Sequence, residues 1–468
     1  MSAFRRHLEA VRRGARARAG EIACAAAGAL AFAGLIAAFS LFPPRRAEAV
    51  PSFAQQTGLP CAACHVGAFG PQLKPYARDF KLFGYVNGDG RNTLPPIALV
   101  MLSSFNHTQA PQDLGVAHYG PNDNLTIDQI NLIYGGALPG GAGTFAEVTY
   151  DGVHRAFTID NLDIKRAINP RFGGHEAVLG LDLNNRPTVQ DLWNSTPTWG
   201  FPYNASALAP TLAASTLLDG QLAQRVLGVG AYGMWDNTLY TEFTAYAPVA
   251  NSTLVHLGVR TDPGADVYDG MLPYWRVALQ HALGDDHYFE VGAYGLSAQR
   301  YPGGERSAGL DRLTDVALDG TYQFTGSDDH FVSAHATWIH EREKLDASTR
   351  LLGTNPSNHL DTVRADVSYS YKDTLTPSVQ VFRTWGSHDP ALYGGPGGDP
   401  SSQGYIVELA YVPLGKPGSR IKWANARFTV QYVGYSKFDG VTRGAAGHNT
   451  LYISTRIALA PFGALVQR

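Results

Sequence analysis

Residues 363–371 have the sequence Val-Arg-Ala-Asp-Val-Ser-Tyr-Ser-Tyr, in which apolar or aromatic residues alternate with polar ones. A period of two predicts a β-strand with one apolar face and one polar face. The same alternation occurs at 275–280, 315–324, 427–432 and 453–457. Strands of this kind fit a membrane barrel with a wet lumen, and the alternative is a secreted β-sandwich or β-propeller.

The alternation predicts sixteen strands, an even number, and Tyr and Trp recur toward the strand ends. We expect the strands at 97–107, 125–135, 143–151, 156–167, 175–184, 222–234, 238–247, 273–282, 287–297, 313–325, 330–341, 360–372, 375–386, 404–413, 425–437 and 448–459. Short turns follow at 235–237, 284–286, 327–329 and 372–373, and longer loops at 108–124, 185–221, 248–272, 298–312, 342–359 and 387–403. Short periplasmic turns and long outer loops are typical of outer-membrane barrels. The fold class predicted for residues 93–468 is therefore all-β, a transmembrane antiparallel β-barrel of about 16 strands.

The first 49 residues have the pattern of an export signal. Six arginines between Arg5 and Arg18 precede an apolar run from Ile22 to Phe42, and Ala47-Glu48-Ala49 fits a small-x-small cleavage site. An uncleaved anchor helix is the alternative, because the apolar run is long enough to span a bilayer. The sequence predicts a signal peptide over 1–49 and a mature protein exported to the periplasm of a Gram-negative bacterium.

Removal of residues 1–49 leaves 29 basic and 37 acidic residues, a net charge of −8. An acidic chain attracts cations rather than polyanions. No basic stripe is present, so we expect no nucleic-acid partner. Cys24 lies in the signal, and the mature chain keeps only Cys61 and Cys64.

Those two cysteines belong to Cys61-Ala62-Ala63-Cys64-His65, the attachment motif of a c-type haem. Both thiols form thioethers to the porphyrin, and the adjoining His65 is delivered under the iron as the proximal ligand. A zinc site would need a second Cys or His pair, which does not follow, and a thioredoxin-like pair would need a βαβ context. A plain disulfide is the remaining alternative. We expect one covalent haem c.

The haem segment is predicted to span residues 50–92, with a helix over 71–85 whose apolar face includes Leu73, Ala77 and Phe80. About forty residues cannot build an independent core, so the segment should lean on the rest of the chain. No Met or second His lies between His65 and Met101. Met101 is the candidate for the second axial ligand and His107 is a further one, and for each an ordinary strand position is the alternative.

Several stretches resemble the fused cytochrome–porin family, whose best-known members are the outer-membrane iron(II)-oxidising cytochromes. The stretches are 51–59 before the haem motif, 80–85 after it, and 160–163, 184–194, 431–438 and 449–452 in the barrel. The resemblance covers nearly the whole mature chain. It implies that the haem segment lies in or under the periplasmic mouth of the barrel, and that electrons cross the outer membrane. Cys61, Cys64 and His65 match the family's haem site, whereas His448 stands where an acidic or amide residue is expected.

Three functions are compatible with these features. The first is an electron carrier in the outer membrane that takes electrons from an extracellular donor, Fe(II) above all, and passes them to a periplasmic cytochrome. Such a carrier would act as an iron(II) oxidase. The second is a nutrient or ion porin in which the haem-bearing segment is a plug or sensor. The third is a soluble periplasmic cytochrome with a β-domain.

If Fe(II) is the donor, acidic or His side chains of the long loops should hold it briefly, because carboxylates and imidazoles both suit this ion. The candidates are Asp113, His118 and Asp123 in the first long loop, Asp262, Asp266 and Asp269 in a later one, and Asp191 in the loop that resembles the family. For each of them a solvated surface acid is the alternative.

Overall fold

The computed structural model describes residues 52–88, 96–113, 115–256, 264–327, 329–419, 421 and 423–460. The predicted signal peptide lies outside these residues, as do both ends of the predicted haem segment, Asp262 and the last residues of the chain. Among the described residues, no helix has the length and hydropathy needed to cross a membrane.

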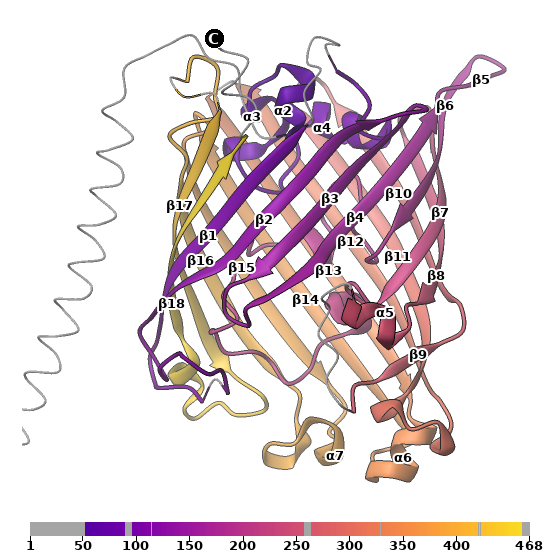
Figure 1. The fold of residues 1–468 in the computed structure, drawn as a ribbon, viewed down its shortest axis with the longest axis vertical. Helices are drawn as coiled ribbons and strands as arrows, with labels where there is room; N and C mark the ends of the chain where they lie inside the picture. Colours follow the sequence, from indigo (N-terminus) through magenta and orange to yellow (C-terminus); the bar gives the residue numbers. More distant parts are fainter. Residues whose placement is uncertain are drawn as a thin grey trace, which may run out of the picture. The chain divides into compact units, whose positions relative to one another are not determined.

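The described chain from Ile97 to Leu459 forms one antiparallel sheet that closes on itself (Figure 1). The sixteen long strands are β1 (Ile97–Thr108), β2 (Asn124–Leu138), β3 (Ala142–Asp151), β4 (Ala156–Ile168), β6 (His175–Asn184), β7 (Val226–Trp235), β8 (Leu239–Pro248), β10 (Leu272–Leu283), β11 (His287–Tyr301), β12 (Asp311–Ser327), β13 (His330–Lys344), β14 (Ser357–Tyr371), β15 (Leu375–Gly386), β16 (Ser402–Tyr411), β17 (Ala424–Lys437) and β18 (Thr450–Leu459). Two short strands, β5 (Arg171–Phe172) and β9 (Val267–Asp269), pair with β6 and β11 respectively. The pairing of β1 with β18, in the register Leu99 to Leu459, closes the barrel. The predicted barrel of about 16 strands is confirmed.

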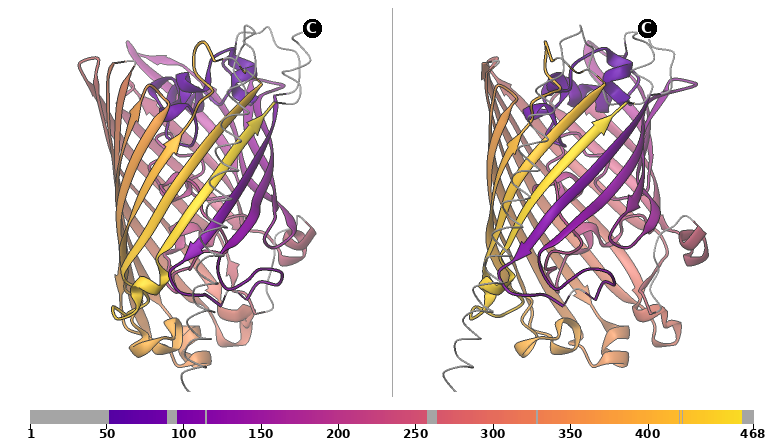
Figure 2. Two further views of the ribbon diagram at one scale, coloured as in Figure 1. Left: turned by 90° about the vertical axis from the view of Figure 1, so that its left-hand side faces the viewer. Right: turned by 60° about the vertical axis from the view of Figure 1, so that its left-hand side comes forward.

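The connections differ in length at the two mouths of the barrel (Figure 2). At one mouth, turns of three residues join β2 to β3, β7 to β8, β10 to β11 and β14 to β15. The opposite mouth carries the long loops, with α5 (Asn251–His256), α6 (Asp346–Leu352) and α7 (Pro390–Tyr393). The mouth with the short turns therefore faces the periplasm, as predicted.

The N-terminal helices lie within the periplasmic mouth (Figure 1). They are α2 (Ser52–Thr57), α3 (Cys61–Cys64), the short η1 (Val66–Ala68) and α4 (Pro75–Leu82). The predicted helix over 71–85 is shorter than expected. Its first residues pair with the haem motif instead, through a bridge between His65 and Leu73, and the helix then begins at Pro75, a residue suited to a first turn.

Alternate side chains of each strand face opposite sides of the barrel wall. On β14, Val367 is 51% exposed and the next residue, Ser368, is fully buried. Leu318 on β12 and Val291 on β11 are likewise outside and exposed. A closed barrel with an apolar exterior is a membrane-spanning structure, since all backbone groups are paired within the sheet. The protein is thus an outer-membrane barrel, and a soluble sandwich, propeller or periplasmic cytochrome with a β-domain is excluded.

The lumen is occupied by residues 185–225, which connect β6 to β7 and which we call the inner loop. It contains η2 (Pro197–Trp199) and η3 (Leu217–Gln221). Its residues Leu192 and Trp193 are 1% exposed and pack against Leu82 of α4 and Tyr240 of β8. The inner loop and the N-terminal helices together form the core of the barrel interior.

Candidate functional site

The two cysteines and the histidine of the predicted haem site lie on one turn. Cys61 and Cys64 are the first and last residues of α3, and the amide of His65 donates to the carbonyl of Cys61 at 2.8 Å. The amide of Lys74 in turn donates to the carbonyl of Cys64 at 2.9 Å, which ties the turn to the start of α4. The two cysteines are not joined by a disulfide. The motif therefore presents both thiols and the imidazole from the same short segment.

A cavity of about 440 Å³ opens beside this turn. This volume lies within the range of cofactor pockets. Its wall contains both cysteines and His65 and is otherwise largely apolar and aromatic, with Phe53, Leu73, Phe80, Tyr85, Val100, Ile133, Phe145, Trp199, Pro202 and Tyr203 among the lining residues. A polar stretch of the wall includes Asn161, Asn425 and Arg456.

The chemistry of these groups fits a covalent haem. The Nδ1 atom of His65 is buried and has no hydrogen-bond partner among the residues that the structure describes. Burial lowers the pKa of His65 to about 4, so its imidazole is neutral, the form that binds a metal. Burial also raises the pKa of Cys61 to about 12 and that of Cys64 to about 11, which keeps both as thiols. The residues present can thus form both thioethers and supply one axial ligand.

Met101 does not reach this cavity, so its prediction as the second axial ligand is wrong. Val100 lines the cavity, and side chains alternate along β1, so Met101 faces the lipid. His107 is also on the outer face and lies near the opposite mouth, where its Nδ1 is 2.6 Å from Asp123. The described residues that line the cavity include no methionine and no second histidine.

Polar contacts, partly or fully buried, fasten the N-terminal helices to the barrel. Lys74 forms an ion pair of 2.8 Å with Asp373, whose other oxygen accepts from the amide of Gly67 at 2.9 Å. On the far side, the side-chain amide of Asn425 donates to the carbonyl of Ala68 at 2.8 Å. At Gly143 of β3, a Cβ atom would lie 2.2 Å from the carbonyl oxygen of Gly84, so the close approach requires glycine. The segment is held on several sides, as its small size requires.

The inner loop contacts the haem segment directly. Lys81 of α4 donates to the carbonyl of Val189 at 2.8 Å and to Oδ1 of Asn194 at 3.0 Å. Asn194 donates back to the carbonyl of Pro71 at 2.7 Å. Burial and the nearby Lys165 lower the pKa of Lys81 to about 7. Trp199 and Asn194 of the inner loop also line the cavity, so this loop completes the site.

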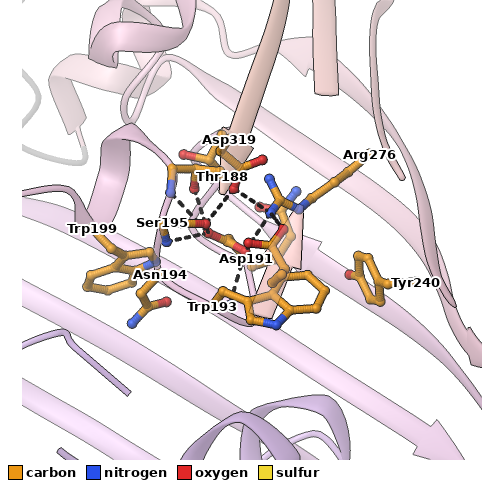
Figure 3. Close-up of polar contacts among 12 residues, drawn as sticks. Thr188, Asp191, Trp193, Asn194, Ser195, Trp199, Tyr240, Arg276 and Asp319 are labelled. Atoms are coloured by element: carbon orange, nitrogen blue, oxygen red, sulfur yellow. Dashed lines mark hydrogen bonds and ion pairs between the residues drawn. The ribbon is translucent and has the colours of Figure 1, made fainter. Parts of the chain in front are cut away.

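Asp191 organises the inner loop. Its Oδ2 accepts from the amides of Ser195 and Thr196 at 2.9 and 3.1 Å, and its Oδ1 lies 3.5 Å from Arg276 of β10 (Figure 3). Arg276 also contacts Glu290 at 3.1 Å and Asp319 at 2.8 Å. All four charged side chains are buried. Asp191 thus joins the loop to the barrel wall.

Further contacts extend this attachment around the lumen. Arg364 of β14 donates two hydrogen bonds to Asp219 in η3, at 2.5 and 2.8 Å. The amides of Leu217 and Leu218 donate to Glu341 and Asp315 at 2.7 and 2.8 Å. The inner loop therefore contacts strands on several sides of the barrel and obstructs the lumen.

The structure does not gather the predicted iron-binding residues. Asp191 is buried in the contacts above, and Asp266 forms an ion pair with Arg300 at 2.9 Å. Asp123 pairs with His107, whereas Asp113 and His118 are exposed and Asp269 is half-buried on β9. Among the residues that the structure describes, no three His, Cys, Asp or Glu side chains are placed to share a metal ion. The described loop acids therefore lie apart from one another and form no shared iron site.

Sequence patterns did not indicate several residues of the site. Asp373 and Gly143 are far from the haem segment in sequence and contact it only in the folded chain, Asp373 at Lys74 and Gly67 and Gly143 at Gly84. The stretch 184–194 did indicate the inner loop, because it resembles the family's long-loop motif. Its dense run of Asn, Thr, Gln and Asp was a usable signal of internal hydrogen bonding.

Neither a family model nor a curated protein matches the sequence. Among solved structures, the barrel is similar to the outer membrane channel DcaP of Acinetobacter baumannii, at 12% identity over 78% of this chain and 96% of that one, with a TM-score of 0.45. It is also similar to the anion-selective porin from Comamonas acidovorans, at 12% identity over 78% and 98% of the two chains, with a TM-score of 0.43. OmpF of Salmonella typhi shows 11% identity over 78% and 97%, with a TM-score of 0.42. This likeness concerns the fold alone.

Proposed function

We propose that Cys61, Cys64 and His65 hold one covalent c-type haem at the periplasmic mouth of the barrel, and that the protein transfers electrons across the outer membrane. The observation that carries this proposal is the placement of the Cys-x-x-Cys-His turn beside an apolar cavity of about 440 Å³. When bound, the haem would supply a one-electron redox centre.

The surrounding side chains would orient that group and keep water from it. Phe53 packs edge-on against Phe80 with ring centroids 5.0 Å apart, and stacks on Tyr85 at 5.3 Å. The inner loop adds Trp199, whose ring lies 5.9 Å from that of Phe145. An apolar cage of this kind controls solvent access to a redox centre and so tunes its potential.

The distribution of charge favours a cationic donor from outside. Among the described buried side chains, 16 are Asp or Glu and 6 are Lys or Arg. With a net charge of −8 for the predicted mature chain, this excess attracts cations such as Fe(II) toward the lumen. Acidic residues of the loops would contribute to this general field rather than form one binding site.

The electron acceptor would be a soluble periplasmic cytochrome. The outer side of α4 exposes Tyr76 and Asp79 at the periplasmic mouth, beside the turn that holds the motif. A partner can approach this face without entering the barrel. Transient electron-transfer contacts need only a small interface.

Proteoliposomes test the proposal. The purified protein is reconstituted with a soluble c-type cytochrome enclosed, and Fe(II) is added outside. The expected result is reduction of the enclosed cytochrome by the intact protein and none by the Cys61→Ser, Cys64→Ser double variant. No reduction by the intact protein would contradict electron transfer.

The alternative function, a porin with a haem-bearing plug, differs in a second observable. The inner loop and the N-terminal helices obstruct the lumen, so we expect little single-channel conductance in planar bilayers. A large, steady conductance together with no electron transfer would favour the porin.

A further inference from the structure

At the extracellular ends of β12 and β13, acidic side chains point into the lumen and basic side chains point outward. Residues 340–344 are His-Glu-Arg-Glu-Lys, and alternation sends Glu341 and Glu343 into the lumen, where they are 1% and 6% exposed. Arg342 and Lys344 point outward and are exposed. On β12, Asp311 is fully buried inside, and the next residue, Arg312, is exposed outside.

The three outward cations are neighbours. Arg312 lies directly opposite Lys344 in the antiparallel pair, and Arg342 lies opposite Thr314, one outward position further down. Residues opposite each other on one face have Cβ atoms about 5 Å apart, so the three charges form one cluster. We call Arg312, Arg342 and Lys344 the basic patch.

Among the described residues, no acidic side chain pairs with the basic patch. Within the part of the chain that the structure describes, none of its three side chains makes a hydrogen bond or an ion pair. The outward positions beside it on β11 and β14 are Gln299, Ser357 and His359. The first outward acid below it, Asp361, is already bonded to Trp338 and His340, each at 3.0 Å. Like charges placed opposite each other destabilise a sheet unless an anion joins them.

The patch lies at the level of the outer-leaflet headgroups. Trp338 is the outward aromatic residue of β13 nearest to it, and such residues mark the membrane interface. At about 2.3 Å of height per residue for a strand tilted by about 45°, Arg342 lies about 9 Å above Trp338. Long cationic side chains also reach along a surface by several ångströms. Below Trp338 the wall is apolar, with Val291 and Val367 exposed.

We propose that the basic patch binds a phosphorylated glycolipid of the outer leaflet. Its phosphates would accept charge-assisted hydrogen bonds from both guanidinium groups and the ammonium, while its acyl chains lie against the apolar wall below. This inference does not depend on the proposed haem, because the patch is on the outside of the barrel.

Native mass spectrometry of the full barrel in detergent, titrated with diphosphorylated lipid A, tests this proposal. Near a membrane each cation contributes about a fivefold change in affinity. We expect single Gln variants at Arg312, Arg342 or Lys344 to bind about fivefold more weakly, and the triple variant about a hundredfold. Arg166→Gln, an exposed outward arginine at the periplasmic end of β4, should bind like the unaltered protein.

The paired variant Arg312→Lys, Arg342→Lys keeps the charge and should retain most of the affinity, which separates charge from folding. Dephosphorylated lipid A, phosphatidylglycerol and inorganic phosphate should all bind more weakly than the phosphorylated glycolipid. The proposal is overturned if the triple Gln variant, in a folded barrel, binds as tightly as the unaltered protein. Equal binding of dephosphorylated lipid A or of phosphatidylglycerol would also overturn it, as would equal losses in Arg166→Gln.

Discussion

Replacing Val367 by Arg places a charge in the middle of the lipid-facing wall. Val367 is 51% exposed and points outward from β14. Its cross-strand neighbours are Ala334 of β13 and Val379 of β15, which also faces lipid and is 49% exposed. An arginine at this position would meet only apolar side chains and acyl chains.

The depth of Val367 fixes the size of the effect. Tyr371, an aromatic residue of the periplasmic girdle, lies four residues along β14 in one direction. Four residues in the other direction, Val363 pairs with Trp338 of the outer girdle. With about 2.3 Å of height per residue, Val367 lies about 9 Å from both levels, at the midplane between them. Arginine at a barrel midplane costs about 2–4 kcal/mol.

Reversible unfolding in urea, followed by tryptophan fluorescence in lipid vesicles, measures this cost. We expect Val367→Arg to lower the folding equilibrium constant between about 30- and 700-fold. The matched control is Thr241→Arg, which is outward and exposed on β8, two residues from the Leu239–Trp235 pair at the periplasmic edge. Near the interface the same charge costs about 0–1 kcal/mol. Equal effects at the two positions would refute a membrane-spanning wall at β14.

Three further predictions concern the site. Gly143→Ala places a Cβ atom against the carbonyl oxygen of Gly84, and this overpacking should cost about 1–3 kcal/mol. The haem segment should then loosen and become sensitive to protease. The control Gly320→Ala, where the nearest atom to the new Cβ is 3.4 Å away, should not change protease sensitivity. Asp191→Ala removes one acidic partner of the buried Arg276 at a cost of about 3–5 kcal/mol. The inner loop should then detach from the barrel wall, and the single-channel conductance should rise. The control Asp123→Ala should leave the conductance unchanged. Burial lowers the pKa of Lys81 to about 7, from an unfolded value near 10.4. Between about pH 7 and pH 10.4 the unfolded chain therefore binds more protons than the folded chain. The unfolding temperature should rise with pH in this range. Lys81→Met should lose that rise, and a rise that persists would contradict the assignment.

The strands could be predicted from the sequence because each has a period of two, which local residues alone determine. Val367 and Ser368 were assigned to the correct faces for this reason. The contents of the lumen could not be predicted in the same way. The alternation at 363–371 places Ser368 on the polar face, but it does not show that Gln72 of the haem segment donates to the Ser368 hydroxyl at 3.2 Å. A larger side chain there would displace the segment.

In the candidate site, too, the features set by neighbouring residues could be predicted, and those set by contacts between distant segments could not. The turn of Cys61, Cys64 and His65 was predictable because its groups are adjacent in sequence. The chemistry of Met101 and its distance along the chain suggest an axial ligand, but the alternation of side chains along β1 places Val100 inside and Met101 outside. The sequence shows Asp191 only as an acid in a long loop, whereas its place beside Arg276 depends on how the inner loop folds into the barrel.

The mass of the purified, denatured protein tests the central claim most directly. Covalent attachment predicts that the intact protein, expressed in a host that attaches c-type haem, is heavier than its mature chain by one haem. Cys61→Ser and Cys64→Ser together should give the mass of the polypeptide alone, while the barrel still inserts into the membrane. A polypeptide mass without haem for the intact protein, or a haem retained by the double variant after denaturation, would contradict the account.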